Sequence, residues 1–386
     1  MLMQFSVTNH RSIREQAVIS MKANADKTMK DTLISPDGRK KLLPVMAIYG
    51  ANAAGKSNLL HALMLMKEMV CGNYARLLKG EHLPQEPFES NEASDKPTTF
   101  EIIFYQDSVK YAYGFSFNHR EILNEYLYQW PNGREALIFL RENGRYEFRE
   151  NIQEQNTLAG RTQDNRLYLT TSNEWNCPQT SNAFLWFAAN LNCLSVMASS
   201  NATTLESIKN GDHEKDRILK EMLNADLGIC DITVTGTVED PVISTVHRMV
   251  DTDGNTELLT LKLSQESMGT QRFFSRIGSW VEAMQKGSVL LVDEIEASMH
   301  PLLTRHLIEM IQDPSINTNH AQLIFTTHNV GLLDLTLLRR DQIWFAERNY
   351  KTMKTEIYAL TEFSPRKDEN IVKCYLQGRY GALPFI

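Results

Sequence analysis

Eight residues in the first quarter of the chain have the types and spacing of a loop that wraps around phosphate. They read Gly50-Ala-Asn-Ala-Ala-Gly55-Lys56-Ser57. The two glycines let successive backbone N–H groups turn toward phosphate oxygens, and Lys56 neutralises the phosphate charge. The hydroxyl of Ser57 is a typical ligand of Mg²⁺ in such loops. This segment predicts an ATP–Mg²⁺ site.

The residues on either side of this loop favour the same interpretation. Val45–Tyr49 is a short apolar run that predicts a buried strand. Between Asn58 and Val70 the apolar residues recur at helical spacing, which predicts a helix. A strand, a glycine loop and a helix in this order are what a phosphate-binding loop requires.

A second pair of candidate residues lies far along the chain. Val289–Val292 is an apolar run, and Asp293 and Glu294 follow it directly. At the end of such a strand, Asp293 can hold Mg²⁺ and Glu294 can act as the general base that activates water. Many buried strands end in acidic turns without any catalytic role. In a chain that also carries the glycine loop, the catalytic interpretation is favoured.

Two further segments have simple structural explanations when each is taken alone. Ser267-Met-Gly269-Thr270 precedes an amphipathic helix, so Ser267 could be an ordinary helix cap, or its hydroxyl and the N–H of Gly269 could hold a phosphate. His328 follows the apolar run Gln322–Thr327. It could contact a γ-phosphate, although a single histidine at a strand end is more often structural.

The order of these four pieces resembles the ABC-type ATPases of the SMC, Rad and RecF kind. In that family the Ser-x-Gly segment completes the nucleotide site of the opposing subunit. The resemblance therefore implies that Ser267 and Gly269 act in trans, that ATP binds between two heads, and that the protein is at least a homodimer. It also implies that Glu294 and His328 are catalytic and that Ser57 and Asp293 hold Mg²⁺.

The same family supplies three more expectations. Asn9-His10-Arg11-Ser12 resembles a segment that contacts nucleotide, which assigns that role to Arg11 and Ser12; His10 stands where an aromatic residue is usual. Glu296–Pro301 looks like the dimer-contact loop. Gln106 is a candidate for the glutamine loop of the family.

Three segments narrow the resemblance to RloA/AbiL-like ATP-binding proteins: Tyr49–Asn58, Lys110–Phe115 and Tyr375–Pro384. The first of them adds Asn52 and Asn58 to the predicted nucleotide-binding residues. These are bacterial ATPases associated with phage defence and restriction-linked loci, so the resemblance implies a partner effector. The segment after His328 is too short for the Toprim nuclease that some relatives carry there, and we expect any such nuclease to act in trans.

Two other functions remain as alternatives. A RecF-like ATPase that binds DNA during repair shares the same motifs, whereas a chromosome-bridging protein is disfavoured because long heptad arms are absent. A transporter-associated ATPase is disfavoured because no apolar run approaches the roughly 18 residues of a membrane-spanning helix. We therefore expect a cytoplasmic protein.

The predicted fold class is α/β, an ABC-type head with a parallel P-loop core, an antiparallel β subdomain and a helical insertion. We expect one domain over residues 1–386. Residues 1–149 form a lobe with the phosphate loop and the β subdomain, 150–228 a mixed helical insertion, and 229–386 a second lobe with the remaining motifs. We expect a helix over Thr204–Leu223 in the insertion and a strand over Ile232–Val238 in the second lobe. The predicted strands of the β subdomain are Phe100–Tyr105, Lys110–Phe117, Glu125–Trp130 and Ala136–Arg141.

The composition limits the kinds of ligand and partner that we expect the protein to bind. Hydrophobic residues make up 42% and charged residues 23%, which is ordinary globular usage. The net charge of -7 argues against general affinity for nucleic acid, although a local basic face would still permit it. The 5 cysteines are scattered without paired spacing, so neither a zinc site nor a disulfide framework is indicated.

Overall fold

The structure is a computed structural model that describes residues 1–194, 201–209, 212–224, 228–237, 241–250, 254–297, 299–366 and 369–384. Three predicted segments fall partly outside these ranges. They are the dimer-contact loop at Ser298, the helix over Thr204–Leu223 at Asn210 and Gly211, and the strand over Ile232–Val238 at its last residue.

A six-stranded sheet forms the centre of the molecule, with the strand order β16-β15-β3-β14-β13-β9. Its strands are β3 (Val45–Tyr49), β9 (Leu191–Leu194), β13 (Val289–Val292), β14 (Gln322–Thr327), β15 (Ile343–Arg348) and β16 (Thr355–Ala359). All neighbours pair in parallel except β15 and β16. Every residue of β3, β13 and β14 is buried, which is why these strands read as continuous apolar runs in the sequence.

Alternate side chains of this central sheet face two different cores. Met46 and Ile48 of β3 belong to one hydrophobic cluster, whereas Val45, Ala47 and Tyr49 belong to the other. A strand turns successive side chains to opposite faces of its sheet. The central sheet therefore has a packed layer on each side.

The first layer is an antiparallel sheet with the strand order β2-β1-β4-β5-β6-β7-β8. Its strands are β1 (Leu2–Thr8), β2 (Ala17–Ser20), β4 (Thr98–Gln106), β5 (Val109–Phe117), β6 (Ile122–Trp130), β7 (Ala136–Glu142) and β8 (Arg145–Phe148). The helices of this layer are α1 (Lys56–Cys71), α2 (Ile152–Ala159), α3 (Tyr168–Glu174) and α4 (Pro178–Asn190). Trp186 of α4 stacks on Phe104 of β4 with ring centroids 4.3 Å apart, which joins the helices to the sheet.

The second layer contains α7 (Met268–Lys286), α8 (Pro301–Gln312) and α9 (Ile371–Leu376). The buried stripe of α7, which includes Phe273, Ile277 and Trp280, packs in the second core. The Trp280 indole N–H donates to the carbonyl of Leu307 in α8 over 2.9 Å. Short 3₁₀ turns occur at Lys30–Thr32, Leu263–Gln265, Val330–Leu332, Arg340–Gln342 and Leu360–Phe363.

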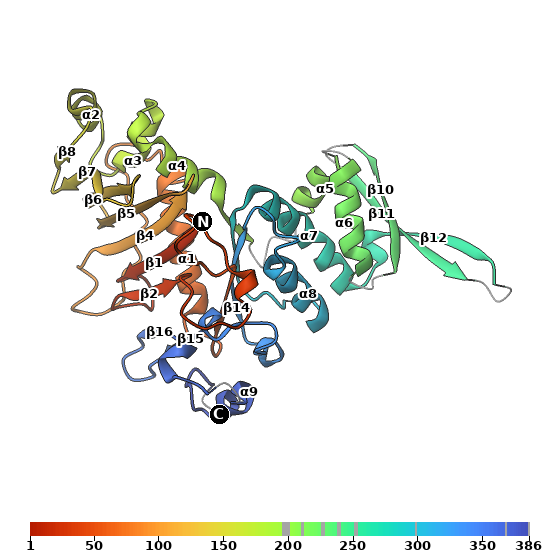
Figure 1. The fold of residues 1–386 in the computed structure, drawn as a ribbon. Helices are drawn as coiled ribbons and strands as arrows, with labels where there is room; N and C mark the ends of the chain where they lie inside the picture. Colours follow the sequence, from red (N-terminus) through yellow and green to blue (C-terminus); the bar gives the residue numbers. More distant parts are fainter. Residues whose placement is uncertain are drawn as a thin grey trace.

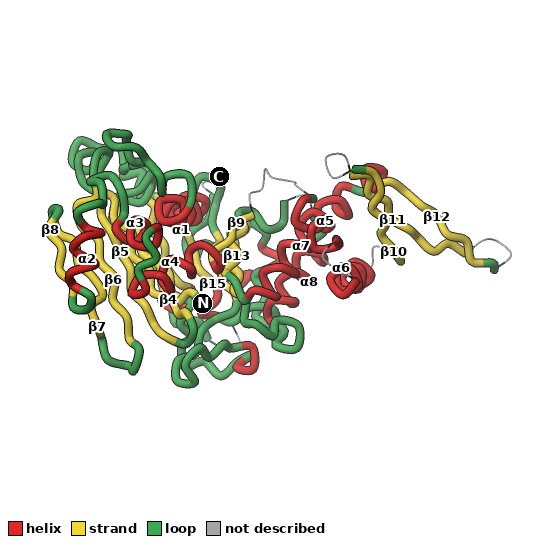
Figure 2. The backbone as a smooth tube through the Cα atoms, turned by 90° about the horizontal axis from the view of Figure 1, so that it is seen from above, coloured by secondary structure: helices red, strands yellow, loops and turns green. Residues whose placement is uncertain are grey.

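A third, three-stranded sheet extends from the end of the molecule opposite the antiparallel layer (Figure 1, Figure 2). We call its strands the arm: β10 (Ile229–Gly236), β11 (Pro241–Val250) and β12 (Thr256–Lys262), in the order β10-β11-β12. Helices α5 (Ala202–Lys209) and α6 (Asp212–Asn224) precede the arm and pack beside α7. The arm therefore lies between β9 and α7 in the chain.

The predicted α/β class, with a parallel core sheet and an antiparallel β subdomain, is confirmed. The sequence did not predict β8, β9, β15 or β16, and the predicted helix over Thr204–Leu223 is two helices. β9 lies inside the segment expected to be helical, yet it pairs with β13 in the central sheet. In the part of the chain that the structure describes, no helix is long and apolar enough to span a membrane.

Helix α7 contacts α5 at a glycine that leaves no room for a side chain. A Cβ at Gly278 would lie 2.4 Å from Cα of Thr204, and the Thr204 hydroxyl donates to the carbonyl of Phe274 over 2.7 Å. We expect Gly278→Ala to lower the free energy of unfolding by about 1–3 kcal/mol, because α5 must shift. Gly160→Ala is the control, since its Cβ would make only ordinary contacts at 3.6 Å. Urea unfolding measures the stability of both variants. Equal midpoints would contradict the close contact between Gly278 and Thr204.

Candidate nucleotide site

The phosphate loop connects β3 to α1, and both of its glycines are enclosed by neighbouring backbone or side chains. Gly55 has φ +100°, and a Cβ there would lie 2.2 Å from Oγ1 of Thr355 and 2.9 Å from Oγ of Ser12. A Cβ at Gly50 would lie 2.3 Å from the carbonyl oxygen of Ala346 in β15. Strands β15 and β16 therefore support the loop from behind and require glycine at both positions.

Lys56 begins α1 and turns its ammonium group back into the loop. The group donates to the carbonyls of Gly50 and Ala51 over 2.8 and 3.0 Å. Burial lowers the pKa of Lys56, while the carboxyl groups of Asp293, Glu294 and Glu296 oppose the shift. A cation surrounded in this way is prepared to bind an anion in the loop.

Parallel pairing brings the acids to the loop. Phe325 of β14 lies opposite both Ala47 of β3 and Val292 of β13, so the residues that follow these three strands meet at one edge of the sheet. At this edge the Thr326 hydroxyl donates to the carboxylate of Asp293 and accepts from the backbone N–H of Glu294, the latter over 2.8 Å. One hydroxyl thus fixes both predicted acids.

Glu294 has a left-handed backbone with φ +47°. Such a conformation is uncommon for a residue other than glycine, and it is often found at functional sites. The bend directs the chain away from β13 immediately after Asp293. It places Glu294 half-buried at the edge of the sheet.

His328 lies one residue after β14 and is held by Glu296. Oε1 of Glu296 accepts from the backbone N–H of His328 over 2.8 Å and lies 3.1 Å from its Nδ1. Because a carboxylate only accepts hydrogen bonds, this contact favours the tautomer with its proton on Nδ1. The His328 side chain is 56% exposed, so its ring is accessible beside the loop.

Ser12 and Asn58 support the loop. The Ser12 hydroxyl accepts from the Asn58 amide over 2.7 Å and from the Thr355 hydroxyl over 2.8 Å. The Thr355 hydroxyl also lies 2.9 Å from the carbonyl of Ala54 in the loop. The segment that contains Ser12 therefore helps to hold the phosphate loop in place.

Arg11 lies beside α1 in a small charged cluster. Its guanidinium contacts Glu86 and lies 3.0 Å from Nε2 of His61, and the imidazole of His61 stacks on that of His10 with centroids 5.3 Å apart. Burial lowers the pKa of His10 to about 3, and the neighbouring His61 and Arg11 add to this shift. The neutral ring of His10 fills the position at which the resembled family has an aromatic residue.

Ser267 and Gly269 are not part of this arrangement. The Ser267 hydroxyl accepts from the backbone N–H of Thr270 over 3.1 Å, so it caps α7. Arg276, whose guanidinium donates to the carbonyl of Ile295 beside the acids, lies nine residues further along α7. At 1.5 Å per residue, Ser267 lies about 13 Å from Arg276 along the helix axis, toward the start of the helix.

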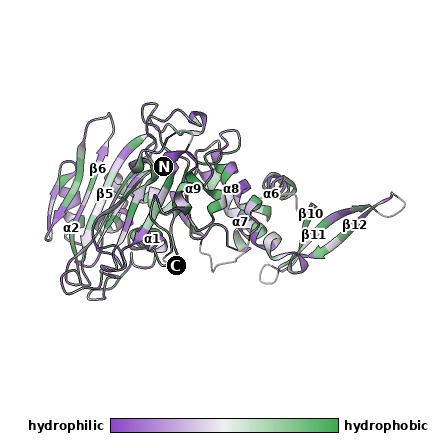
Figure 3. Cartoon of the chain, turned by 90° about the horizontal axis from the view of Figure 1, so that it is seen from below, coloured by the Kyte–Doolittle hydropathy of each residue, from purple (hydrophilic) through white to green (hydrophobic). Residues whose placement is uncertain are grey.

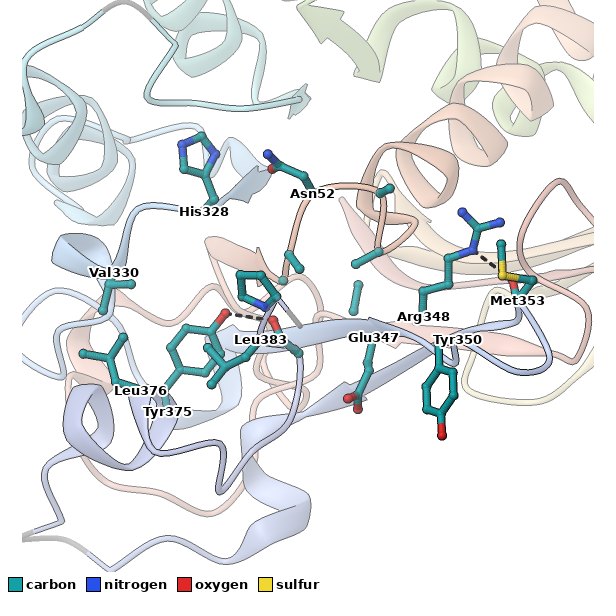
Figure 4. A pocket seen from close by; sticks show the side chains of 17 residues that line it. Asn52, His328, Val330, Glu347, Arg348, Tyr350, Met353, Tyr375, Leu376 and Leu383 are labelled. Carbon is teal, nitrogen blue, oxygen red and sulfur yellow. Dashed lines mark hydrogen bonds between the residues drawn. The ribbon is translucent and has the colours of Figure 1, made fainter. Parts of the chain in front are cut away.

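A cavity of about 800 Å³ opens beside the loop (Figure 4). Its wall includes Asn52 and His328 on one side, Arg348 and Tyr350 on another, and the segment from Tyr375 to Pro384. The carbonyl of Ala382 accepts from the backbone N–H of Ala51 over 3.0 Å and from the Tyr375 hydroxyl over 3.1 Å. This segment, singled out in the sequence only by resemblance, is thus attached directly to the phosphate loop.

One predicted residue, Gln106, lies far from the site, and three residues that were not predicted belong to it. Gln106 ends β4 at the hairpin to β5, whereas Thr99 at the opposite end of β4 pairs with Thr8, next to the segment that reaches the loop. Gln106 is therefore remote from the loop. The roles of Thr326, Thr355 and Glu296 in the site were not predicted from the sequence, although two threonines directly before His328 were a visible signal for the first of them.

Comparison with known proteins gives the family. Residues 45–334 match the family described as AAA domain, putative AbiEii toxin, Type IV TA system. The chain belongs to this AAA-domain family. No curated protein matches the chain.

Among solved structures, the AAA-domain chain is similar to the SmcHead bound to the C-winged helix domain of ScpA. The sequence identity is 13% and the TM-score is 0.41, and the match covers 94% of this chain and 99% of that chain.

Nucleotide binding should depend on the glycine at position 55. We expect Gly55→Ala to abolish ATP binding, because the added Cβ would collide with Thr355 and move the loop. Gly80→Ala is the matched control: Gly80 also has a positive φ, +88°, but a Cβ there would meet nothing within 4 Å. Calorimetric titration with ATP measures the affinity of both variants. Equal affinities in the two variants would show that the loop does not bind the nucleotide.

The buried His10 should make the fold sensitive to acid. Its pKa is about 3 in the folded chain and about 6.5 when unfolded, so the neutral ring contributes full stability above pH 6.5, and this is lost as the pH falls toward 3. Between pH 7 and pH 5 we expect the wild type to lose about 2 kcal/mol more free energy of unfolding than His10→Phe. Urea unfolding at both pH values measures this difference. Equal losses of free energy of unfolding in the wild type and in His10→Phe would show that His10 is not the source of the acid sensitivity.

Proposed function

We propose that this AAA-domain protein binds and hydrolyses ATP between two copies of the chain. The observation that carries the proposal is the position of the Lys56 ammonium group, held by loop carbonyls and close to Asp293, Glu294 and Glu296. A cation that receives phosphate and acids that handle a metal ion and water are the parts that ATP hydrolysis requires.

The residues present fit a magnesium ion. Ser57 is exposed in the first turn of α1, and Asp293 is half-buried with its carboxylate oriented by Thr326. A hydroxyl and a carboxylate are ligands that Mg²⁺ prefers, and we assign the ion to these two side chains together with phosphate oxygens. When bound, Mg²⁺ neutralises charge on the phosphate groups.

Glu294 is the proposed general base. Thr326 fixes its backbone, and the left-handed bend holds the residue at the edge of the sheet beside the loop lysine. The carboxylate accepts a proton from the attacking water. His328 is proposed to donate to the transferred phosphoryl group through Nε2 when both ring nitrogens carry a proton, because Glu296 accepts from Nδ1 and a phosphoryl oxygen also only accepts.

A second copy is proposed to complete the site. Asn52, Ala53 and Ser57 are exposed around the loop, so a partner has access to it. Ser267 and Gly269 have the chemistry of a phosphate cradle at a helix start, and the recorded bonds of the Ser267 hydroxyl go to Thr270 of its own helix, not to the loop. We propose that they close the loop of the other copy, with residues 1–149 and 229–386 as the two lobes of each head.

The family and the resemblance together support a proposal for the biological role. The family description refers to a type IV toxin–antitoxin system, and the RloA/AbiL-like segments are associated with phage defence. We propose that the protein is the ATPase subunit of a bacterial defence system in the cytoplasm and controls a separate effector, such as a Toprim-like nuclease. Nucleic acid is a candidate for the signal it senses.

Glu294→Gln tests the proposal. The variant keeps a side chain of the same size but cannot take up the proton, so we expect ATP binding with turnover at least about 100-fold lower. Because the nucleotide is not consumed, ATP should then hold the variant as a dimer in light-scattering measurements. Lys56→Ala should neither bind ATP nor dimerise. Wild-type turnover in Glu294→Gln would overturn its role as the base.

A further inference from the structure

A short link joins the arm to the helix that carries Ser267. Only the 3₁₀ turn Leu263–Gln265 and Glu266 separate the end of β12 from Ser267. The link is closed by its own hydrogen bonds: the backbone N–H of Lys262 donates to the Gln265 side chain over 2.9 Å. A link this short and this well bonded transmits a displacement of β12 to the start of α7.

The side chain of Glu266 ties this link to the middle strand of the arm. Oε1 of Glu266 lies 2.6 Å from Nε2 of His247 and accepts from the hydroxyl of Thr245, and both of these residues are on β11. The Glu266 side chain is only 9% exposed. Its backbone carbonyl accepts from the Gln271 amide of α7 over 2.8 Å. Glu266 is therefore bonded to the arm through its side chain and to α7 through its backbone.

The arm has a fixed root and a free end. At the root, Thr245 and Ile232 are buried, and Ile232 belongs to the second core. Toward the far end, Val250 is 68% exposed and Leu258 is 67% exposed. Figure 3 shows hydrophobic residues along β11 and β12, well away from the rest of the molecule. The bonds of Glu266 lie at the root, where the arm meets the segment that leads to Ser267.

From these contacts we infer that Glu266 is a positioning residue for ATP hydrolysis: held by Thr245 and His247 of the arm, it sets the position from which Ser267 reaches the nucleotide of a second copy. The inference rests on the proposed function. Ser267 follows Glu266 directly, so any change in the carboxylate contacts moves the serine by way of a single peptide unit. The phosphate loop of the same chain is not involved.

The experiment measures ATP turnover in three variants of the full-length protein. Glu266→Ala removes both contacts to the arm, Glu266→Gln keeps an oxygen that accepts from Thr245 and His247, and Glu257→Ala removes an exposed carboxylate from β12 of the same arm. We expect Glu266→Ala to lower kcat about tenfold or more with an unchanged affinity for ATP. Glu266→Gln should recover most of the turnover, and Glu257→Ala should equal the wild type.

A mixing experiment separates positioning from a general structural defect. Glu266→Ala keeps an intact phosphate loop and Lys56→Ala keeps an intact Ser267 segment, so a mixture of the two variants should turn over more ATP than the sum of the two measured alone. If the wild type itself has no turnover above that of Lys56→Ala, the proposed function fails. If the wild type is active, three results overturn the inference on Glu266: full turnover in Glu266→Ala, a weakened ATP affinity in that variant, or a mixture without recovered activity.

Discussion

The pairing of β14 with both β3 and β13 is the constraint on which the site depends. All three strands run in parallel, and Phe325 lies level with Ala47 on one side and Val292 on the other. A loop lysine and two acids, separated by more than half of the chain, therefore leave the sheet at the same edge. Thr326, the next residue of β14, then binds both acids. A shift of β14 by one residue would separate these groups and turn buried side chains to the wrong core.

Other parts of the fold hold the residues at this edge of the sheet in position. Strands β15 and β16 approach the two loop glycines so closely that no side chain fits, and the Ala382 carbonyl accepts from the backbone N–H of Ala51 in the loop. On the opposite side of the central sheet, Arg276 attaches α7 to the chain just after the acids. Helix α7 thereby connects the acids of one site to Ser267, which lies nine residues before Arg276 at the start of the helix. The same helix can contribute to two sites if two heads come together.

Local sequence was sufficient for the parts of the site that lie within one short segment. The glycine loop, the acid pair and the helix after Ser267 each have a strong local pattern, and the structure has a helix, strand or loop where each was expected. The missed parts depend on distant contacts. Thr355 matters because β16 lies behind Gly55, and β9 is a strand because β13 provides a pairing edge. Gln106 was misjudged because sequence does not reveal which end of an antiparallel strand faces the loop.

The central claim is that each ATP is hydrolysed by two chains, with the phosphate loop from one and Ser267 from the other. Turnover in a mixture of Lys56→Ala and Ser267→Ala chains tests it most directly. Each variant should be inactive alone, whereas a mixed dimer contains one site with both parts intact. The account predicts that an equimolar mixture recovers turnover well above that of either variant, because each mixed dimer has one working site. A mixture as inactive as its components would contradict it.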